Sequence, residues 1–92
     1  MPNDTRASGY AQQLKAWQSE NPLRQWRKDN GITLHQTAAM VGCSVSTVQL
    51  WESGANVPSG KYLDKLTKIL GPNAQTRWMR WHGRQPEPPQ IS

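Results

Sequence analysis

The sequence predicts an all-α domain. Apolar residues recur three and four positions apart in successive stretches, which is the spacing of one buried helix face. Glycines and prolines interrupt these stretches, and Asn, Ser or Thr, the residues that cap helix N-termini, precede several of them. No stretch alternates apolar and polar residues as a half-buried strand does. The 92 residues suffice for one small domain with a modest core.

The first two helices are predicted on either side of Asn21. Residues 1–8 are polar and small, and we expect a disordered N-terminus there. A helix over 9–19 carries one apolar face, made of Tyr10, Leu14 and Trp17. Asn21 is a good N-cap and Pro22 a good first helical residue, so a second helix starts here and runs to about residue 29.

Two helices are predicted on either side of Gly42, over 34–41 and from 45 to 52 or 53. Thr33 and Ser44 suit their N-caps. Their inward positions are Leu34, Thr37, Ala38, Val41, Val48 and Trp51. Helices joined by so short a turn must cross sharply, which leaves one face of the second helix exposed.

The last two helices are predicted over 60–70 and 74–82, with Ser59 and Asn73 as their N-caps. Their apolar positions are Tyr62, Leu63, Leu66, Ile69, Leu70, Trp78, Met79 and Trp81. The remaining residues, 84–92, are rich in proline, and we expect them to form a disordered tail.

The composition favours a polyanionic partner. Lys and Arg number 11 against 6 for Asp and Glu, a net charge of +5, which suits nucleic acid or an anionic membrane surface. The single cysteine, Cys43, cannot form an internal disulfide, and this indicates a reducing compartment. No apolar run is long enough to span a membrane, and the N-terminus has no apolar signal core. We therefore expect a cytoplasmic protein that does not bind membranes.

The segment around Gly42 has the pattern of a helix-turn-helix, whose second helix enters the DNA major groove. Ala38 is small where two crossing helices come closest. Gly42 can adopt the positive φ that a tight turn requires. Val48 is apolar where a side chain must fill the crossing. These residues together predict DNA binding through the helix that begins after Ser44.

The run GITLHQTAAMVGCSVSTVQLWESGANVP, followed by KLTKILG, resembles the lambda-repressor-like (Cro/repressor, Xre) helix-turn-helix family. The resemblance covers about residues 21–71, the core of a helical domain over 9–83. The matching positions are Thr33, Ala38, Gly42, Ser46, Thr47, Trp51, Glu52, Gly54 and Pro58. The resemblance implies a five-helix bundle that reads operator DNA, usually as a dimer on a two-fold site. The chain adds an extra N-terminal helix and a short C-terminal helix.

The candidate DNA-contacting residues fall into two sets. The helix from 45 to 53 offers base-reading side chains, because Gln can pair with the N6 and N7 edge of adenine and apolar groups can meet a thymine methyl. The base-reading candidates are Val45, Ser46, Gln49 and Leu50. The candidates for the DNA backbone are Arg27, Thr33, Gln36, Ser44, Thr47, Ser53, Asn56, Ser59 and Lys61. The family's usual phosphate-binding Gln is replaced by Leu34, and Gln36 or His35, on the same turn, is a possible substitute.

The family resemblance also implies a structural ion pair between Arg27 and Glu52, which would aim the guanidinium at a phosphate. Trp26 and Trp51 are expected in the core. The segment TRWMRWHGR interleaves basic and aromatic residues, and three interpretations of it stay open. Trp17, Trp78 and Trp81 could pack together and close the core, form a dimer interface, or stack on nucleic acid.

The sequence therefore predicts a sequence-specific, double-stranded DNA-binding transcriptional regulator, a small phage or bacterial repressor or a Cro-like protein that binds its operator as a homodimer. Two alternatives are a phage DNA-packaging or recombination accessory protein or an antitoxin, and a protein-interaction module on a helix-turn-helix scaffold. His35 and His82 lack metal-ligand spacing, and no catalytic constellation stands out. We expect no enzyme activity, no metal, no cofactor and no small-molecule ligand.

Overall fold

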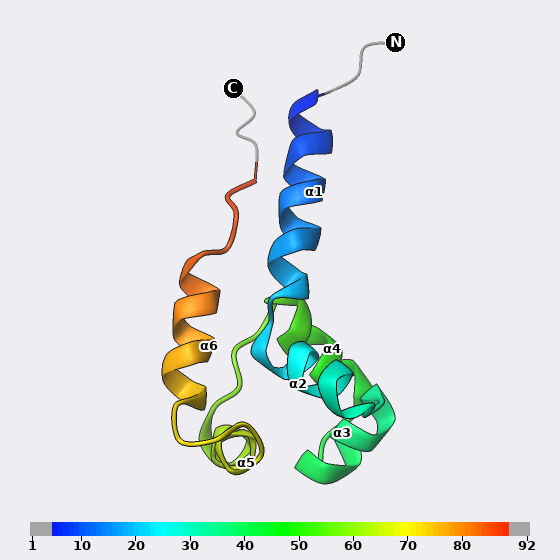
Figure 1. Ribbon diagram of the computed structural model, residues 1–92, viewed down its shortest axis with the longest axis vertical. Helices are drawn as coiled ribbons and strands as arrows, with labels where there is room; N and C mark the ends of the chain where they lie inside the picture. Colours follow the sequence, from blue (N-terminus) through cyan, green and yellow to red (C-terminus); the bar gives the residue numbers. More distant parts are fainter. Residues whose placement is uncertain (1–4, 89–92) are drawn as a thin grey trace.

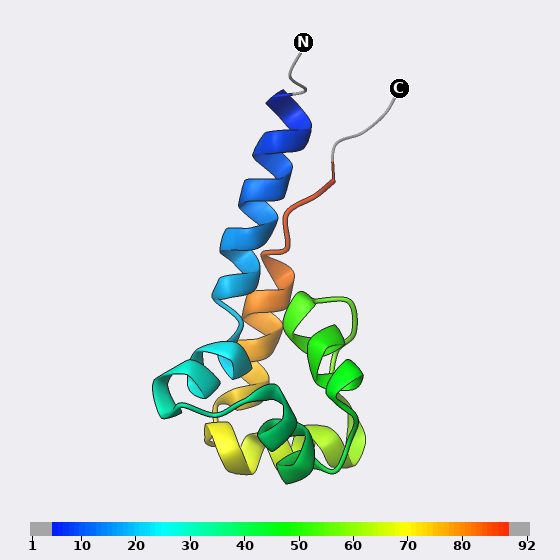
Figure 2. The ribbon, with the colours of Figure 1, turned by 90° about the vertical axis from the view of Figure 1, so that its right-hand side faces the viewer.

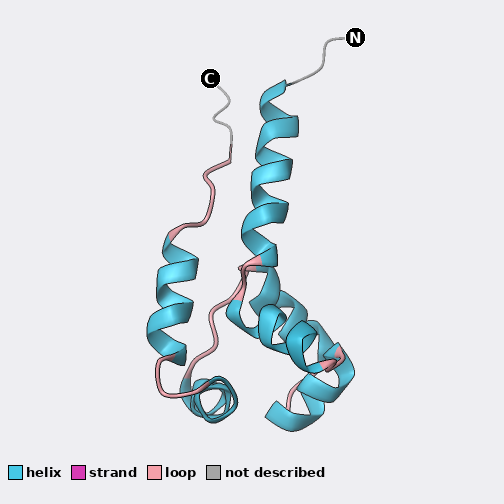
Figure 3. Ribbon diagram, viewed as in Figure 1, coloured by secondary structure: helices cyan, strands magenta, loops and turns pink. Residues whose placement is uncertain are grey.

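The computed structural model describes residues 5–88. Within that range the chain forms helices and no strands, which confirms the predicted fold class (Figures 1 and 3). The helices are α1 Thr5–Ser19, α2 Pro22–Asn30, α3 Leu34–Val41, α4 Val45–Ser53, α5 Gly60–Leu70 and α6 Ala74–Gly83.

The two ends of the chain differ from the sequence-based expectation in one respect. Residues 5–8 belong to α1 and are not part of a disordered N-terminus. The stretch TRAS contains no Pro or Gly, so nothing in it interrupts a helix that continues past Gly9. Residues 1–4 and 89–92, which were also expected to be disordered, lie outside the described residues. Residues 85–88 have no regular secondary structure.

All five predicted N-caps can be compared with their hydrogen bonds, and Thr33 Oγ1 accepts from Gln36 N as expected. The Asn21 side chain accepts from the amides of Leu23 and Arg24, and the Ser44 hydroxyl accepts from Thr47 N. Ser59 and Asn73 occupy the N-cap positions of α5 and α6, but their side chains make no capping hydrogen bond. The predicted N-cap positions are therefore correct, but neither side chain forms the capping hydrogen bond. The residue that follows Ser59, Gly60, has a positive φ of 56°.

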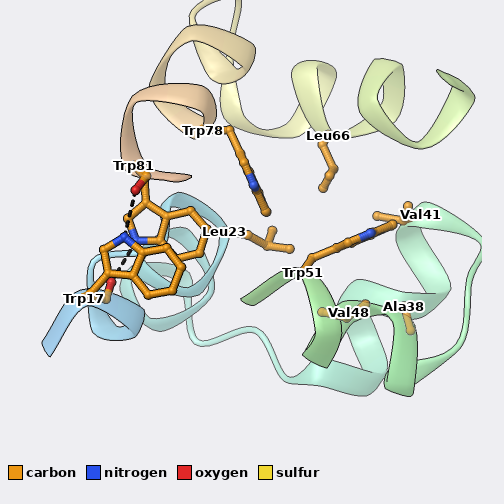
Figure 4. Packing of buried hydrophobic residues seen from close by; sticks show 9 residues of the cluster. All are labelled: Trp17, Leu23, Ala38, Val41, Val48, Trp51, Leu66, Trp78 and Trp81. Carbon is orange, nitrogen blue, oxygen red and sulfur yellow. Dashed lines mark hydrogen bonds between the residues drawn. The ribbon is translucent and has the colours of Figure 1, made fainter. Parts of the chain in front are cut away.

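The core lies where α2, α3, α4, α5 and α6 meet the C-terminal end of α1 (Figure 4). Leu23, Val41, Val48 and Leu66 are completely buried in it. Trp51 comes from α4 and is 3% exposed, whereas Trp26 is only half-buried and packs against the core from its edge. The apolar faces that the sequence predicts thus converge on one centre.

Helix α1 projects from this bundle, and both views show its N-terminal part standing clear of the other helices (Figures 1 and 2). Only its last turns reach the core, where Trp17 stacks flat on Trp81 with ring centroids 4.1 Å apart. Each indole N–H donates to the other residue's carbonyl oxygen at 2.7 Å. The two tryptophans therefore join the first helix to the last.

The tryptophans do not form an exposed surface. Trp17, Trp78 and Trp81 are 4%, 2% and 1% exposed, so they close the core. The alternatives of an aromatic dimer interface or a stacking platform for nucleic acid are wrong for these side chains. The reason is that α6 runs back beside the end of α1, which turns the indoles of both helices toward each other.

We expect Gly54→Ala to destabilise the protein by about 2–5 kcal/mol. Gly54 has a φ of 85°, a conformation that costs an L-residue about 1–2 kcal/mol. A Cβ at this position would also overlap the indole ring of Trp17, and such overpacking costs about 1–3 kcal/mol. Chemical denaturation of the purified variant measures the change. Gly31→Ala is the matched control, because Gly31 has a φ of 64° but open space around it, so only the backbone term applies. Equal losses in the two variants would contradict the contact with Trp17.

Candidate nucleic-acid interface

Helices α3 and α4 form the predicted helix-turn-helix. Gly42 ends α3 in the left-handed conformation, with φ 83°, and its amide donates to Ala38 O at 2.8 Å. Cys43 N donates to the same carbonyl at 3.0 Å. Ala38 and Val48 are buried between the two helices, so the small residue and the apolar plug occupy the positions that the sequence analysis assigned to them. This turn sets the angle at which α4 leaves the bundle.

The outer face of α4 presents a short uncharged surface. Ser46, Gln49 and Leu50 are exposed, Leu50 by 42%. Val45, the fourth base-reading candidate, is instead half-buried and packs against the core. It lies three residues before the buried Val48, and residues three apart share a helix face. Of the four candidates for base reading, the exposed ones are therefore Ser46, Gln49 and Leu50.

Arg27 and Glu52 hold α2 and α4 together. Arg27 Nε donates to Glu52 Oε2 at 2.7 Å and Nη2 donates to Oε1 at 2.8 Å, a bidentate pair that is 12% and 6% exposed. Arg27 Nη1 also donates to Ile32 O at 3.2 Å. The hydrogen bond to Glu52 raises the pKa of Arg27 more than burial lowers it. The guanidinium therefore stays charged, and most of its donors serve the fold.

The backbone candidates at the starts of α3 and α4 also bond within the chain. Thr33 and Gln36 form a reciprocal capping box, in which Gln36 Oε1 accepts from Thr33 N at 2.8 Å and Thr33 Oγ1 accepts from Gln36 N at 3.0 Å. The hydroxyls of Ser44 and Thr47 lie 2.9 Å apart. Thr33, Gln36 and Ser44 remain exposed, so each can still offer a free donor to an anion in front of the helix ends.

The loop after α4 contributes the remaining backbone candidates. Asn56, Ser59 and Lys61 are exposed, and Ser53 is half-buried. The amides of Ala55 and Asn56 both donate to Leu50 O, at 3.0 and 3.2 Å, which folds the start of the loop back onto α4. The start of the loop is thus held close to α4.

A shallow cleft of about 180 Å³ lies between α1, α2, α3 and α4. Its lining consists of Gln18, Arg24, Arg27, Leu34, Gln49, Glu52 and Ser53. The sequence analysis did not single out Arg24 or Gln18 for function. Arg24 precedes Arg27 by three residues, the spacing of a shared helix face, and this was the available signal. Gln18 carries no such signal, because its place depends on how α1 meets the end of α4.

Two further side chains near the turn have structural roles. Lys65 is exposed, and it donates from Nζ to Val41 O at 3.1 Å, a carbonyl at the end of α3. Burial raises the pKa of the Cys43 thiol, and the nearby Lys65 charge partly offsets this. The Cys43 thiol therefore loses its proton less readily than an exposed cysteine does.

The described part of the chain offers neither a membrane-crossing helix nor a metal-binding cluster. None of its helices combines the length and the apolar character needed to cross a membrane. Its His, Cys, Asp and Glu side chains form no group of three or more that could hold a metal ion.

Comparison with known proteins identifies the same segment. A family model described as helix-turn-helix matches residues 23–71, more than half of the chain. The match begins in α2 and ends just after α5, so it contains the turn, α4 and the following loop and leaves out α1 and α6. No curated protein and no solved structure matches the chain.

Proposed function

The chain belongs to the lambda-repressor-like helix-turn-helix family of DNA-binding regulators, and we propose that it regulates transcription by binding one operator sequence in double-stranded DNA. In this proposal α4 enters the major groove. A protein with this task works in the cytoplasm of a bacterium or of a phage-infected cell. Its action is that of a small repressor or a Cro-like protein that occludes a promoter.

The exposed face of α4 is the observation that carries the proposal. Gln49 can bond an adenine edge through two hydrogen bonds, Ser46 can bond a base or a phosphate, and Leu50 can contact a thymine methyl. An exposed leucine beside polar residues suits a groove that presents both hydrogen-bonding edges and methyl groups. The capped helix starts and the loop after α4 would fix the register by contacting phosphates on either side.

We further propose that the protein binds as a homodimer. Two-fold-related copies would place their α4 helices in successive major grooves, about 34–36 Å apart, and the operator would be a pseudo-palindrome. The buried tryptophans are not available for this contact, so the dimer must use another surface.

Selection from random duplex DNA tests the proposed function. We expect the purified protein, at roughly 0.15 M salt, to enrich one motif with two-fold symmetry. Footprinting of that motif at the protein's own promoter supports a regulator, whereas footprints at a packaging or recombination site would contradict one. Recovery of no motif, with binding that only weakens as salt rises, would also contradict the proposal.

Gln49→Ala is expected to weaken binding to the selected site by about 1–3 kcal/mol and to relax preference at one base pair. The reason is that alanine cannot make the paired hydrogen bonds to adenine. Titrations against the selected duplex and its single-base variants measure both effects. Gln13→Ala is the matched control, since Gln13 is exposed on α1, outside the candidate interface. Unchanged base preference in Gln49→Ala would remove Gln49 from the reading set.

A further inference from the structure

We propose that Arg24, with the Gln18 amide beside it, binds one phosphate of the DNA backbone in the cleft next to α4. The inference rests on the DNA binding proposed above and adds a contact to it. Its ligand is a phosphodiester, a single negative charge with oxygen acceptors.

Arg24 is the cation of this cleft whose charge no carboxylate balances. Glu52 accepts two hydrogen bonds from Arg27 and so compensates that charge. Among the described residues Arg24 makes no ion pair, and its Nε is buried without a hydrogen-bond partner. A buried donor left without a partner costs free energy, so the half-buried Arg24 side chain gains when it shifts within the cleft to meet an anionic acceptor.

The walls of the cleft suit one anionic group. Gln18 donates from Nε2 to Ser53 O at 3.1 Å, which fixes the amide at the cleft and leaves its second N–H available. Leu34 contributes an apolar wall with no side-chain donor. The cleft volume of about 180 Å³ is several times the roughly 30 Å³ that a water molecule occupies, so a phosphate oxygen fits.

The position of the cleft connects this site to base reading. Gln49 lines the cleft and is also a base-reading candidate, so a phosphate bound by Arg24 would lie beside the bases that α4 contacts. Gln18 comes from α1, which the matched family segment does not include. The extra N-terminal helix would thereby contribute to DNA binding as well as to the core.

The test compares Arg24→Met with wild type on the selected duplex. Methionine keeps an unbranched side chain and removes the charge. We expect affinity to fall about tenfold or more at ~0.1 M salt, equally for all sequences, and the slope of log K against log salt to shrink by about 1. Arg80→Ala is the control, because Arg80 is exposed on α6 and does not line the cleft; its slope should stay close to that of wild type.

Neutral methylphosphonate linkages locate the contact. Replacing one specific phosphate should weaken wild-type binding by the same factor as Arg24→Met, and the two changes together should weaken it no further. Additive losses at every phosphate, or an unchanged salt slope, would overturn the inference while leaving the proposed function intact. Failure of wild type to select any duplex would overturn both.

Stability separates this role from a purely structural one. In the absence of DNA, an arginine whose charge has no partner should lower the stability of the protein. The thermal midpoint of Arg24→Met should therefore be no lower than that of wild type. Arg24→Lys keeps the charge and loses the Nε donor, so it should keep the wild-type salt slope and bind more weakly. A lowered midpoint in Arg24→Met together with unchanged DNA affinity would assign Arg24 to the fold and overturn the inference.

Discussion

Replacing Trp81 with alanine is expected to lower the free energy of unfolding by about 3–5 kcal/mol. The indole is 1% exposed, stacks flat on Trp17 and donates to the Trp17 carbonyl, so its removal leaves a large cavity and breaks that hydrogen bond, while Glu20 N still donates to the same carbonyl. This is a large share of the roughly 5–15 kcal/mol that stabilises a typical domain. Urea denaturation of the variant measures the loss.

Met79→Ala is the control for this prediction. Met79 lies two residues from Trp81 on the same helix but is 53% exposed, so its truncation should change stability by no more than about 0.5 kcal/mol. A double-mutant cycle with Trp17→Ala should show strong coupling, because each indole loses its partner when the other is removed. Independent, additive losses would contradict the reciprocal contact.

Breaking the Arg27–Glu52 pair from one side is the second large effect. Glu52→Ala should destabilise the protein by about 3–5 kcal/mol, since it leaves the Arg27 guanidinium, 12% exposed, without its counter-charge. Replacing both residues with apolar ones, Arg27→Met with Glu52→Leu, should cost much less, because no buried charge then remains. Denaturant titration of the single and double variants gives the comparison.

Glu20→Ala serves as the control for the ion pair. Glu20 lies 3.9 Å from Arg84 in a pair that is 56% and 60% exposed, and solvent screens such a contact. Its removal should leave the unfolding free energy nearly unchanged. If Glu52→Ala behaves like Glu20→Ala, the pair does not hold α2 and α4 together.

The helices and the turn were predictable because local rules decide them. Thr33 and Ser44 cap their helices, and Gly42 adopts the left-handed conformation that ends α3. Ser59 and Asn73 occupy their predicted N-cap positions without a capping hydrogen bond, because that bond also depends on the backbone angles at which the chain enters the helix, and residue type does not specify them. The start of α1 was missed for a related reason, since Gly9 can lie within a helix as well as before one.

The places of the tryptophans and of Arg24 were harder to predict, because they depend on how distant segments meet. Trp17 and Trp81 are separated by most of the chain, and a basic, aromatic sequence is compatible with a surface as well as with a core. Arg24 is a candidate for phosphate binding because no carboxylate pairs with it. That absence depends on how α1, α2 and α4 pack, and the sequence does not show it.

The account's central claim is that α4 reads a specific DNA sequence. The most direct measurement is the ratio of dissociation constants for the selected duplex and for a scrambled duplex of the same length and composition, both at roughly 0.15 M salt. We predict that the selected duplex binds at least about 10³-fold more tightly, the lower end for specific DNA-binding proteins. A ratio near one, with both affinities falling in parallel as salt rises, would contradict sequence-specific binding.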